Sequence, residues 1–310
     1  MILVCGEALF DVYAEDSMHG LRLDARVGGS PFNVAVGLAR LGRRSSLLTG
    51  LSRDFLGKRL RDALNAESID TATLIEIDAP TTLAFVSVGP GGGAEYAFYG
   101  QSAADRSVTV DDLPVLGPEV TAVHAGSYSL VTDPTGAALL ELFRRERGRR
   151  LLSIDPNVRL NVEPDPAVWR SRVAAFSAVA NLIKVSAEDI EALFEGTTAD
   201  DVARRWLAGG AELIVVTHGA DGATAYAADA KVHRPGQSTT PGDGADTVGA
   251  GDTFQAALLA ELDRRGVKEM SALNSNHLAQ MLDFAAHAAA ITCSRRGADL
   301  PRLEEVQGTL

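Results

Sequence analysis

Residues 151–217 of the chain read LLSIDPNVRLNVEPDPAVWRSRVAAFSAVANLIKVSAEDIEALFEGTTADDVARRWLAGGAELIVVT. Three short apolar runs, at residues 151–155, 182–185 and 213–217, are separated by stretches with the length and periodicity of helices. Apolar runs of this length are typical of strands that are buried on both faces. The alternation therefore predicts an α/β fold with a mostly parallel sheet.

The same alternation continues toward the N-terminus. Further buried strands are expected at residues 2–5, 45–50 and 122–125. The covering helices are expected at residues 33–41, 54–67, 136–147, 167–178, 188–194 and 202–208, with two more at 253–264 and 276–292. Because ligands collect beyond the carboxyl ends of parallel strands, Asp155, Ser186 and Thr217 are placed where a binding site is expected. We expect a single α/β domain over residues 1–310.

Residues 83–88 and 95–99 break the pattern, because both are strand-like and flank Gly89-Pro90-Gly91-Gly92-Gly93. This arrangement predicts a β-hairpin. With residues 12–24 it forms either a small sheet that covers the ligand cleft or a plain surface hairpin. The first alternative is a lid made from about residues 12–24 and 83–100.

The composition excludes several classes of partner. The formal net charge of −12 opposes binding to nucleic acid and to anionic membrane surfaces. No apolar run approaches the roughly 18 residues that a membrane-spanning helix requires. The cysteines, Cys5 and Cys293, form neither a disulfide pattern nor a zinc-binding pattern. We therefore expect a soluble protein of the cytoplasm.

The strongest local signal is the segment Asp246-Thr247-Val248-Gly249-Ala250-Gly251-Asp252-Thr253-Phe254, which leads into a helix. Small residues at 249–251 let the backbone approach a ligand, and the N-terminus of a helix stabilises negative charge. Asp252 can accept the proton of an attacking hydroxyl while those N–H groups neutralise a phosphoryl group. The alternative is that Asp252 only caps the helix.

This segment resembles the second signature of the ribokinase-like sugar kinases, the phosphofructokinase B family. Residues 28–42, GGSPFNVAVGLARLG, are similar to the first signature of the same family. The resemblance implies a three-layer α/β sandwich with a small β-sheet lid, and ATP-dependent phosphorylation of a primary hydroxyl of a small carbohydrate. It implies that Asp252 is the catalytic base and that the backbone of Gly249, Ala250 and Gly251 forms the anion hole.

The resemblance also implies a sugar site. Asp11 matches the acid that binds sugar hydroxyls, since a carboxylate accepts two such hydrogen bonds. Gly28 and Gly29 offer backbone contacts without bulk, and Asn33 either bridges sugar hydroxyls or caps a helix. Arg159, in Asp155-Pro156-Asn157-Val158-Arg159, steadies the phosphoryl group or the sugar, although an exposed arginine is more often only solvated.

For the nucleotide, the resemblance implies a site that holds ATP and Mg²⁺. The residues implied are Lys184, Ser186, Thr217, Gly219, Gly222 and His287 for the nucleotide, Glu188 or Asp189 for magnesium through water, and Asp246 with the carbonyl of Val248 for a monovalent cation such as K⁺. From the sequence alone, His287 is instead a residue on a helix surface.

Within the family, the fructokinase branch fits best, and fructose is the expected substrate. Gly6-Glu7-Ala8, His124-Ala125-Gly126-Ser127 and Cys293-Ser294-Arg295-Arg296-Gly297-Ala298 are similar to that branch. Gly100 stands where related kinases carry an arginine after the tyrosine. A 2-keto-3-deoxygluconate, ribose or nucleoside kinase, or a sensor without catalysis, remains an alternative. A homodimer that pairs through the lid and a monomer both stay open. A P-loop is excluded because Arg59 follows Gly57-Lys58.

Overall fold

The structure is a computed structural model that describes residues 1–18, 20–88, 94–242, 245–267 and 269–308. The main sheet contains β1 (Ile2–Cys5), β4 (Ser45–Ser52), β5 (Leu74–Ile77), β8 (Ala122–Gly126), β9 (Leu151–Asp155), β10 (Leu182–Ser186), β11 (Leu213–Thr217), β12 (Ala223–Ala227) and β13 (Ala230–Arg234). Among the described residues the strand order is β13-β12-β11-β10-β9-β8-β1-β4-β5. Neighbouring strands from β5 to β11 are parallel, whereas the β11–β12 and β12–β13 pairs are antiparallel. The predicted α/β fold is confirmed.

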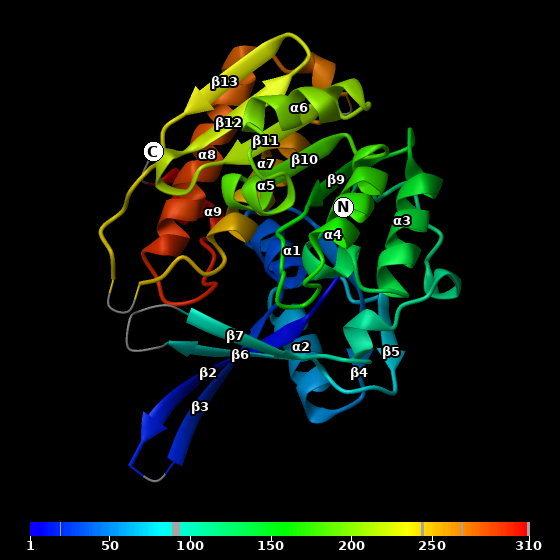
Figure 1. The fold of residues 1–310 in the computed structure, drawn as a ribbon, viewed down its shortest axis with the longest axis vertical. Coiled ribbons are helices and arrows are strands. Elements are labelled where there is room, and N and C mark those ends of the chain that lie inside the picture. The colour runs from blue at the N-terminus through cyan, green and yellow to red at the C-terminus, as the bar shows by residue number, and fades with distance from the viewer. Residues whose placement is uncertain (19, 89–93, 243–244, 268, 309–310) are drawn as a thin grey trace.

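Two helical layers enclose this sheet (Figure 1). One layer contains α1 (Ser30–Arg40), α2 (Phe55–Ala66), α7 (Ala250–Arg264), α8 (Ser275–Cys293) and α9 (Leu303–Gln307), and the other contains α3 (Thr135–Glu146), α4 (Pro166–Ser177), α5 (Ala187–Leu193) and α6 (Ala199–Ala208). Side chains of a strand alternate between the faces, so Ile2 and Val4 of β1 join the first core while Leu3 and Cys5 join the second. In the part of the chain that the structure describes, no helix is long and apolar enough to span a membrane.

The edges of the main sheet were not predicted. β5 is a short strand whose side chains are mostly half-buried, and β12 (ATAYA) is rich in alanine. Alanine is uncommon in strands, and a half-exposed edge lacks the continuous apolar run of a central strand. These strands therefore gave no signal of their own.

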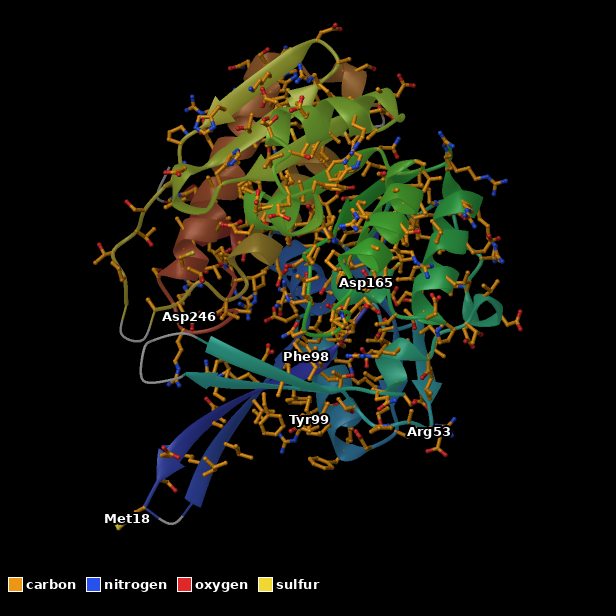
Figure 2. All side chains as sticks on the ribbon, in the orientation of Figure 1. Met18, Arg53, Phe98, Tyr99, Asp165 and Asp246 are labelled. Atoms are coloured by element: carbon orange, nitrogen blue, oxygen red, sulfur yellow. The ribbon has the colours of Figure 1, made fainter. Side chains whose placement is uncertain are left out.

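A second, four-stranded sheet contains β2 (Leu9–Ser17), β3 (Gly20–Gly28), β6 (Leu83–Val88) and β7 (Ala94–Tyr99) in the order β3-β2-β6-β7. It extends away from the main body, and Met18 lies near the tip of its β2–β3 hairpin (Figures 1 and 2). The predicted small sheet is confirmed, although β2 and β3 together reach from residue 9 to residue 28 and so exceed the expected 12–24. The predicted turn at residues 89–93 lies outside the described residues.

Candidate active site

The loop before α7 is held in place by its own backbone and by a segment near the C-terminus. Gly249 is the N-cap residue of α7 with φ of 79°, and a Cβ there would lie 2.6 Å from the Cβ of Ala298. The carboxylate of Asp246 accepts hydrogen bonds from the N–H groups of Val248 and Gly297, both at 2.9 Å. This packing therefore fixes the position of the first turn of α7 and the direction of its backbone N–H groups.

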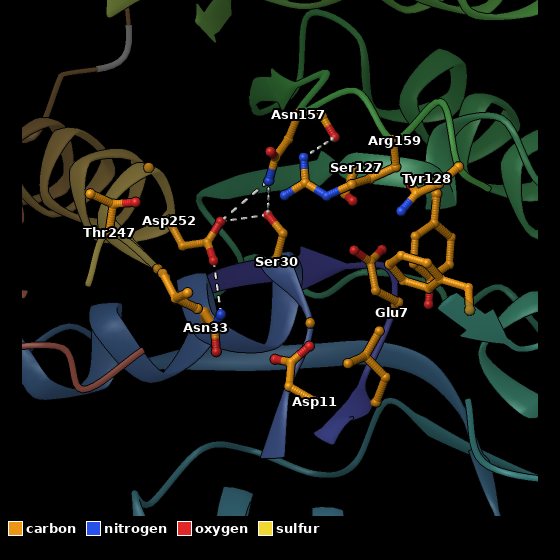
Figure 3. A pocket seen from close by; sticks show the side chains of 17 residues that line it. Glu7, Asp11, Ser30, Asn33, Ser127, Tyr128, Asn157, Arg159, Thr247 and Asp252 are labelled. Carbon is orange, nitrogen blue, oxygen red and sulfur yellow. Dashed lines mark hydrogen bonds between the residues drawn. The ribbon is translucent and has the colours of Figure 1, made fainter. Parts of the chain in front are cut away.

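The carboxylate of Asp252 is held by two hydrogen bonds from α1. The hydroxyl of Ser30 donates to Oδ1 at 2.7 Å, and the amide of Asn33 donates to Oδ2 at 2.8 Å (Figure 3). The amide of Asn157 donates to the Ser30 hydroxyl at 2.9 Å. Asp252 is only 6% exposed and lies in the first turn of α7, so its side chain is oriented by residues far away in the sequence.

Neither Asp252 nor Asn33 caps a helix. The N-cap residues are Gly249 for α7 and Gly29 for α1, and the side chains of Asp252 and Asn33 bond to each other instead. The capping alternative for these two residues is wrong, because both helices begin about three residues earlier than the sequence pattern indicated.

A cavity of about 420 Å³ opens beside this carboxylate. The predicted site residues that line it are Asp11, Gly29, Asn33, Arg159, Val248, Gly249, Gly251 and Asp252. Residues from the two signature segments and from the end of β9 thus meet at one place, as expected for the carboxyl edge of a parallel sheet. Ala250 is not among the lining residues, and its N–H donates to the carbonyl of Thr247.

Other lining residues were not assigned a role from the sequence. They are Glu7, Leu9, Ser30, Phe98, Ser127, Tyr128, Asn157, Asn161 and Thr247. Ser127 follows β8 directly and Asn157 lies two residues after β9, so their position at strand ends was an available signal. Both adopt positive φ, 56° for Ser127 and 40° for Asn157, which sequence patterns do not show.

The part of the cavity lined by Glu7 and Asp11 is acidic. Burial and the neighbouring charge of Asp252 raise the pKa of Asp11 to about 6, although Arg159 opposes the shift. Burial likewise raises the pKa of Glu7 to about 7, despite a hydrogen bond from the hydroxyl of Ser129. Carboxyl groups with raised pKa values in one cavity are typical of functional sites.

Two further predicted residues lie close to the acidic part of the cavity. Gly28 lies behind the lining, and Arg159 belongs to it. A Cβ on Gly28 would lie 2.2 Å from the Oδ2 atom of Asp11, so only glycine leaves room for that carboxylate. Gly28 therefore contacts Asp11 and is not itself part of the cavity lining. The guanidinium of Arg159 donates to the carbonyl groups of Asn157 and Val158 at 3.3 and 3.0 Å, which holds it beside the cavity.

A buried ion pair lies under the first turn of α7. The ammonium of Lys184 donates to the Oδ2 atom of Asp155 at 2.8 Å, and both side chains are almost fully buried. A Cβ on Gly251 would lie 3.2 Å from the Nζ atom of Lys184. Lys184 therefore places a positive charge directly beneath the 249–251 backbone, where an anion would be stabilised.

The remaining residues predicted for the nucleotide lie outside the cavity. Thr217 ends β11, and Gly219 and Gly222 adopt positive φ, 55° and 99°, in the turn that follows. The expectation that His287 lies on a helix surface is wrong. His287 is buried on α8, its Nδ1 atom lies 2.9 Å from the Oε1 atom of Gln237, and burial lowers its pKa.

The two carboxylates predicted for magnesium differ in their surroundings. Asp189 accepts hydrogen bonds from the N–H groups of Val158 and Ser186, at 2.8 and 3.3 Å, and forms a capping box at α5 with Ser186. Glu188 is exposed beside it and acts electrostatically on His218. Within the described ranges, no three His, Cys, Asp or Glu side chains are grouped so that they could hold a metal ion by themselves.

Comparison with known proteins gives a consistent result. The family model described as pfkB family carbohydrate kinase matches residues 1–305. A fructokinase of Rhizobium leguminosarum bv. trifolii is 39% identical over 263 residues, which cover 84% of this chain and 79% of the relative. Probable fructokinase-2 of Arabidopsis thaliana is 32% identical over 308 residues, which cover 96% and 91%. The crystal structure of fructokinase with bound ATP from Xylella fastidiosa has a TM-score of 0.87 and 27% identity, covering 99% of this chain and 97% of that one. With two signature segments joined at one cavity and a match that runs over nearly its whole length, the chain belongs to the pfkB family of carbohydrate kinases.

Proposed function

We propose that this protein transfers a phosphoryl group from ATP to a primary hydroxyl of a sugar, and that the sugar is fructose. One observation carries the reaction type: the carboxylate of Asp252 is held by Ser30 and Asn33 at a cavity where α7 begins. A base fixed beside a helix N-terminus can deprotonate a hydroxyl while backbone N–H groups stabilise the anionic phosphoryl group. The names of the fructokinase relatives support the choice of sugar.

We assign three roles to residues of this chain: proton removal, stabilisation of the phosphoryl group and binding of the sugar. Asp252 takes the proton from the attacking hydroxyl at one of its carboxylate oxygens. Gly249 and Gly251 line the cavity and present the backbone of the anion hole, while the N–H of Ala250 holds the turn through Thr247. Asp11 accepts hydroxyl hydrogen bonds from the sugar, and Arg159 supplies a positive charge at the same cavity.

The nucleotide site fits ATP with magnesium. A cationic Lys184 beneath Gly251 and a helix N-terminus suit a polyphosphate. When bound, Mg-ATP supplies the transferable phosphoryl group and neutralises its charge. Glu188 is our choice to hold magnesium through water, because the Asp189 oxygens already accept backbone N–H groups. Such an ion keeps most of its ligands from water and phosphate. Asp246 and the carbonyl of Val248 stay our proposal for a monovalent cation.

The charge of the cavity favours a neutral sugar over a sugar acid. Three carboxyl residues, Glu7, Asp11 and Asp252, line the cavity against one arginine, Arg159. Gly100 itself adds no positive charge, although a Cβ there would lie 2.8 Å from the Nη2 atom of Arg106. A carboxylate on the substrate would therefore meet a like charge on each of these residues that is ionised, at a cost of several kcal/mol per close contact. Glu7, with a pKa of about 7, contributes only part of a charge near neutral pH. This disfavours 2-keto-3-deoxygluconate, whereas ribose and nucleosides remain alternatives to fructose.

The test measures ADP release from the full-length chain with Mg-ATP and each of fructose, ribose, 2-keto-3-deoxygluconate and a nucleoside. We expect kcat/KM for fructose to exceed that for 2-keto-3-deoxygluconate by roughly 100-fold, because of the like charges. Turnover of the sugar acid in preference to fructose would contradict the charge argument. Binding of ATP or sugar without any turnover would favour the sensor alternative.

The small sheet is proposed as a lid. β2 carries Asp11 and β7 carries Phe98, so both strands reach the cavity from the same side. If sugar binding closes this sheet and excludes water, ADP release without sugar should be at most about 1% of the rate with sugar. A high sugar-independent rate would count against a closing lid.

Pairing of two subunits through the exposed Leu21 and Leu23 of β3 also stays a proposal. The cytoplasmic location is likewise a proposal.

A further inference from the structure

A group of buried polar side chains lies one helical turn beyond Asp252, between α7 and the main sheet. Its members are His124 of β8, Ser153 of β9 and Gln255 of α7, and each is 0% exposed. His124 and Ser153 are paired across adjacent parallel strands. We call these three residues the buried polar cluster. None of them lines the cavity, and nothing in the proposed reaction uses them.

The hydrogen bonds within the buried polar cluster have a direction. The amide nitrogen of Gln255 donates to the Ser153 hydroxyl at 2.9 Å, so the proton of that hydroxyl is free to donate onward. The Nδ1 atom of His124 lies 3.2 Å from the same hydroxyl and accepts that proton. Burial and the charge of Lys184 lower the pKa of His124 to about 3, so the ring is neutral. Its single proton is then on Nε2, which becomes a donor.

A second buried atom without a partner belongs to a residue close to this donor. Among the described residues, none hydrogen-bonds to the Nε2 atom of His124 or to the Oδ1 atom of Asp155, and both atoms are buried. They border the same point: a Cβ on Gly126 would lie 3.6 Å from the His124 Nε2 atom and 3.6 Å from the Asp155 Cβ atom. The Oε1 atom of Gln255 is a third buried atom without a protein partner in the described chain.

We propose that the buried polar cluster is a positioning device, in which the Nε2–H group of His124 donates a hydrogen bond to one internal water molecule. That water donates in turn to the carboxylate of Asp155 and so holds the Asp155–Lys184 pair beneath Gly251. The water accepts from His124 and donates to Asp155 and to the Gln255 carbonyl oxygen, which gives it three partners. Internal waters in proteins are typically held by two to four such bonds. A side chain at position 126 would crowd this point, because its Cβ would lie 2.8 Å from the backbone carbonyl oxygen of Asp155.

The device acts on the phosphoryl side of the reaction and rests on the proposed function. Among the described residues, the ammonium of Lys184 donates a hydrogen bond only to the Oδ2 atom of Asp155, and it lies under the backbone that would stabilise the transferred phosphoryl group. A donor on the Oδ1 atom favours the carboxylate form of Asp155 and fixes its orientation, and thereby fixes the ammonium. Its loss should lower kcat and leave sugar binding unchanged, because Asp11 and Asn33 lie elsewhere in the cavity.

A matched pair of substitutions tests this role. Glutamine at position 124 places an N–H donor where Nε2 stood, whereas asparagine reaches only the Nδ1 position. We expect His124→Asn to lower kcat about 10-fold with the KM for sugar changed less than about 2-fold, and His124→Gln to retain kcat within about 3-fold. Both constants come from ADP release by the full-length variants. Val173→Ala, a cavity-forming change in α4 on the other face of the sheet, is the control for loss of stability.

Three results would overturn the inference. The first is an equal kcat for His124→Asn and His124→Gln. The second is a loss of kcat in both variants that is no larger than the loss in Val173→Ala at a comparable fall in melting temperature. The third is a high-resolution crystal structure with no ordered water between His124 Nε2 and Asp155 Oδ1, where we expect one. The crystal structure shows whether the water is present even if the wild-type chain turns over no sugar. A wild-type chain without any turnover would reject the proposed function and not the water.

Discussion

Replacing Asp252 with asparagine is expected to lower kcat by about 10²–10⁴-fold, the usual contribution of a general base. Asparagine has nearly the same shape but cannot take up the proton of the attacking hydroxyl. The hydroxyl of Ser30 can still donate to its oxygen, and Asn33 can turn its amide to offer an acceptor in place of a donor. The fold and the binding of sugar should therefore persist while the chemical step is lost.

The measurement is ADP release with the best sugar of the panel, together with calorimetric titration of that sugar and thermal unfolding. The control is Asp263→Asn, which changes an aspartate on the same helix far from the cavity. A kcat within about 3-fold of the wild type for Asp252→Asn would mean that another group removes the proton. Loss of the fold or of sugar binding would mean that Asp252 is needed for structure first.

Replacing Lys184 with methionine is expected to destabilise the folded protein by about 3–5 kcal/mol near pH 8, because it leaves the buried carboxylate of Asp155 without its partner. Methionine fills similar space, so a cavity contributes little. The free energy of unfolding from urea titration measures the effect. The double variant Lys184→Met/Asp155→Asn removes the orphaned charge and should recover most of the stability, and a double variant as unstable as the single one would contradict this account.

The loss should also depend on pH. In the folded protein burial raises the pKa of Asp155 from its ordinary value of 3.8 to about 6, with the charges of Asp189 and Asp252 adding to the shift and Lys184 opposing it. Removing Lys184 raises this pKa further. The folded state then binds a proton more tightly than the unfolded state, so stability falls as pH rises through the folded pKa. The destabilisation should shrink toward pH 5, where Asp155 is protonated, and an equal loss at pH 5 and pH 8 would rule out the charge as its cause.

Much of the fold could be predicted because the central strands are buried on both faces. β9 and β11 have the predicted bounds, since an apolar run with a polar residue at each end leaves little choice. β12 and β13 were missed because the pairing of β12 with β11, and of β13 with β12, depends on tertiary context and not on a local pattern. The starts of α1 and α7 were misplaced because Gly29 and Gly249 take positive φ, which is set by the packing around them.

The candidate site was predicted only as far as the two signature segments and the strand ends reach. Asp11, Asn33, Arg159 and Asp252 meet at the cavity as expected. The contact of Ser30 with Asp252 spans 222 residues of sequence, and no periodicity or propensity encodes such a pair. The same is true of Glu7 and Tyr128, whose place in the cavity comes from how β1 and β8 lie side by side.

The long span between Ser30 and Asp252 has a consequence for synthesis on the ribosome. The residues from Glu7 to Asn161 that line the cavity emerge before the segment that carries Asp252. Until α7 and α8 are made, the sheet face that includes Ile2 and Val4 lacks much of its apolar cover. A growing chain that has passed its midpoint therefore carries an exposed, aggregation-prone surface together with an incomplete centre. The last fifth of the chain covers this surface and also supplies Asp252. A released fragment that lacks this part therefore has neither a closed core nor a complete cavity.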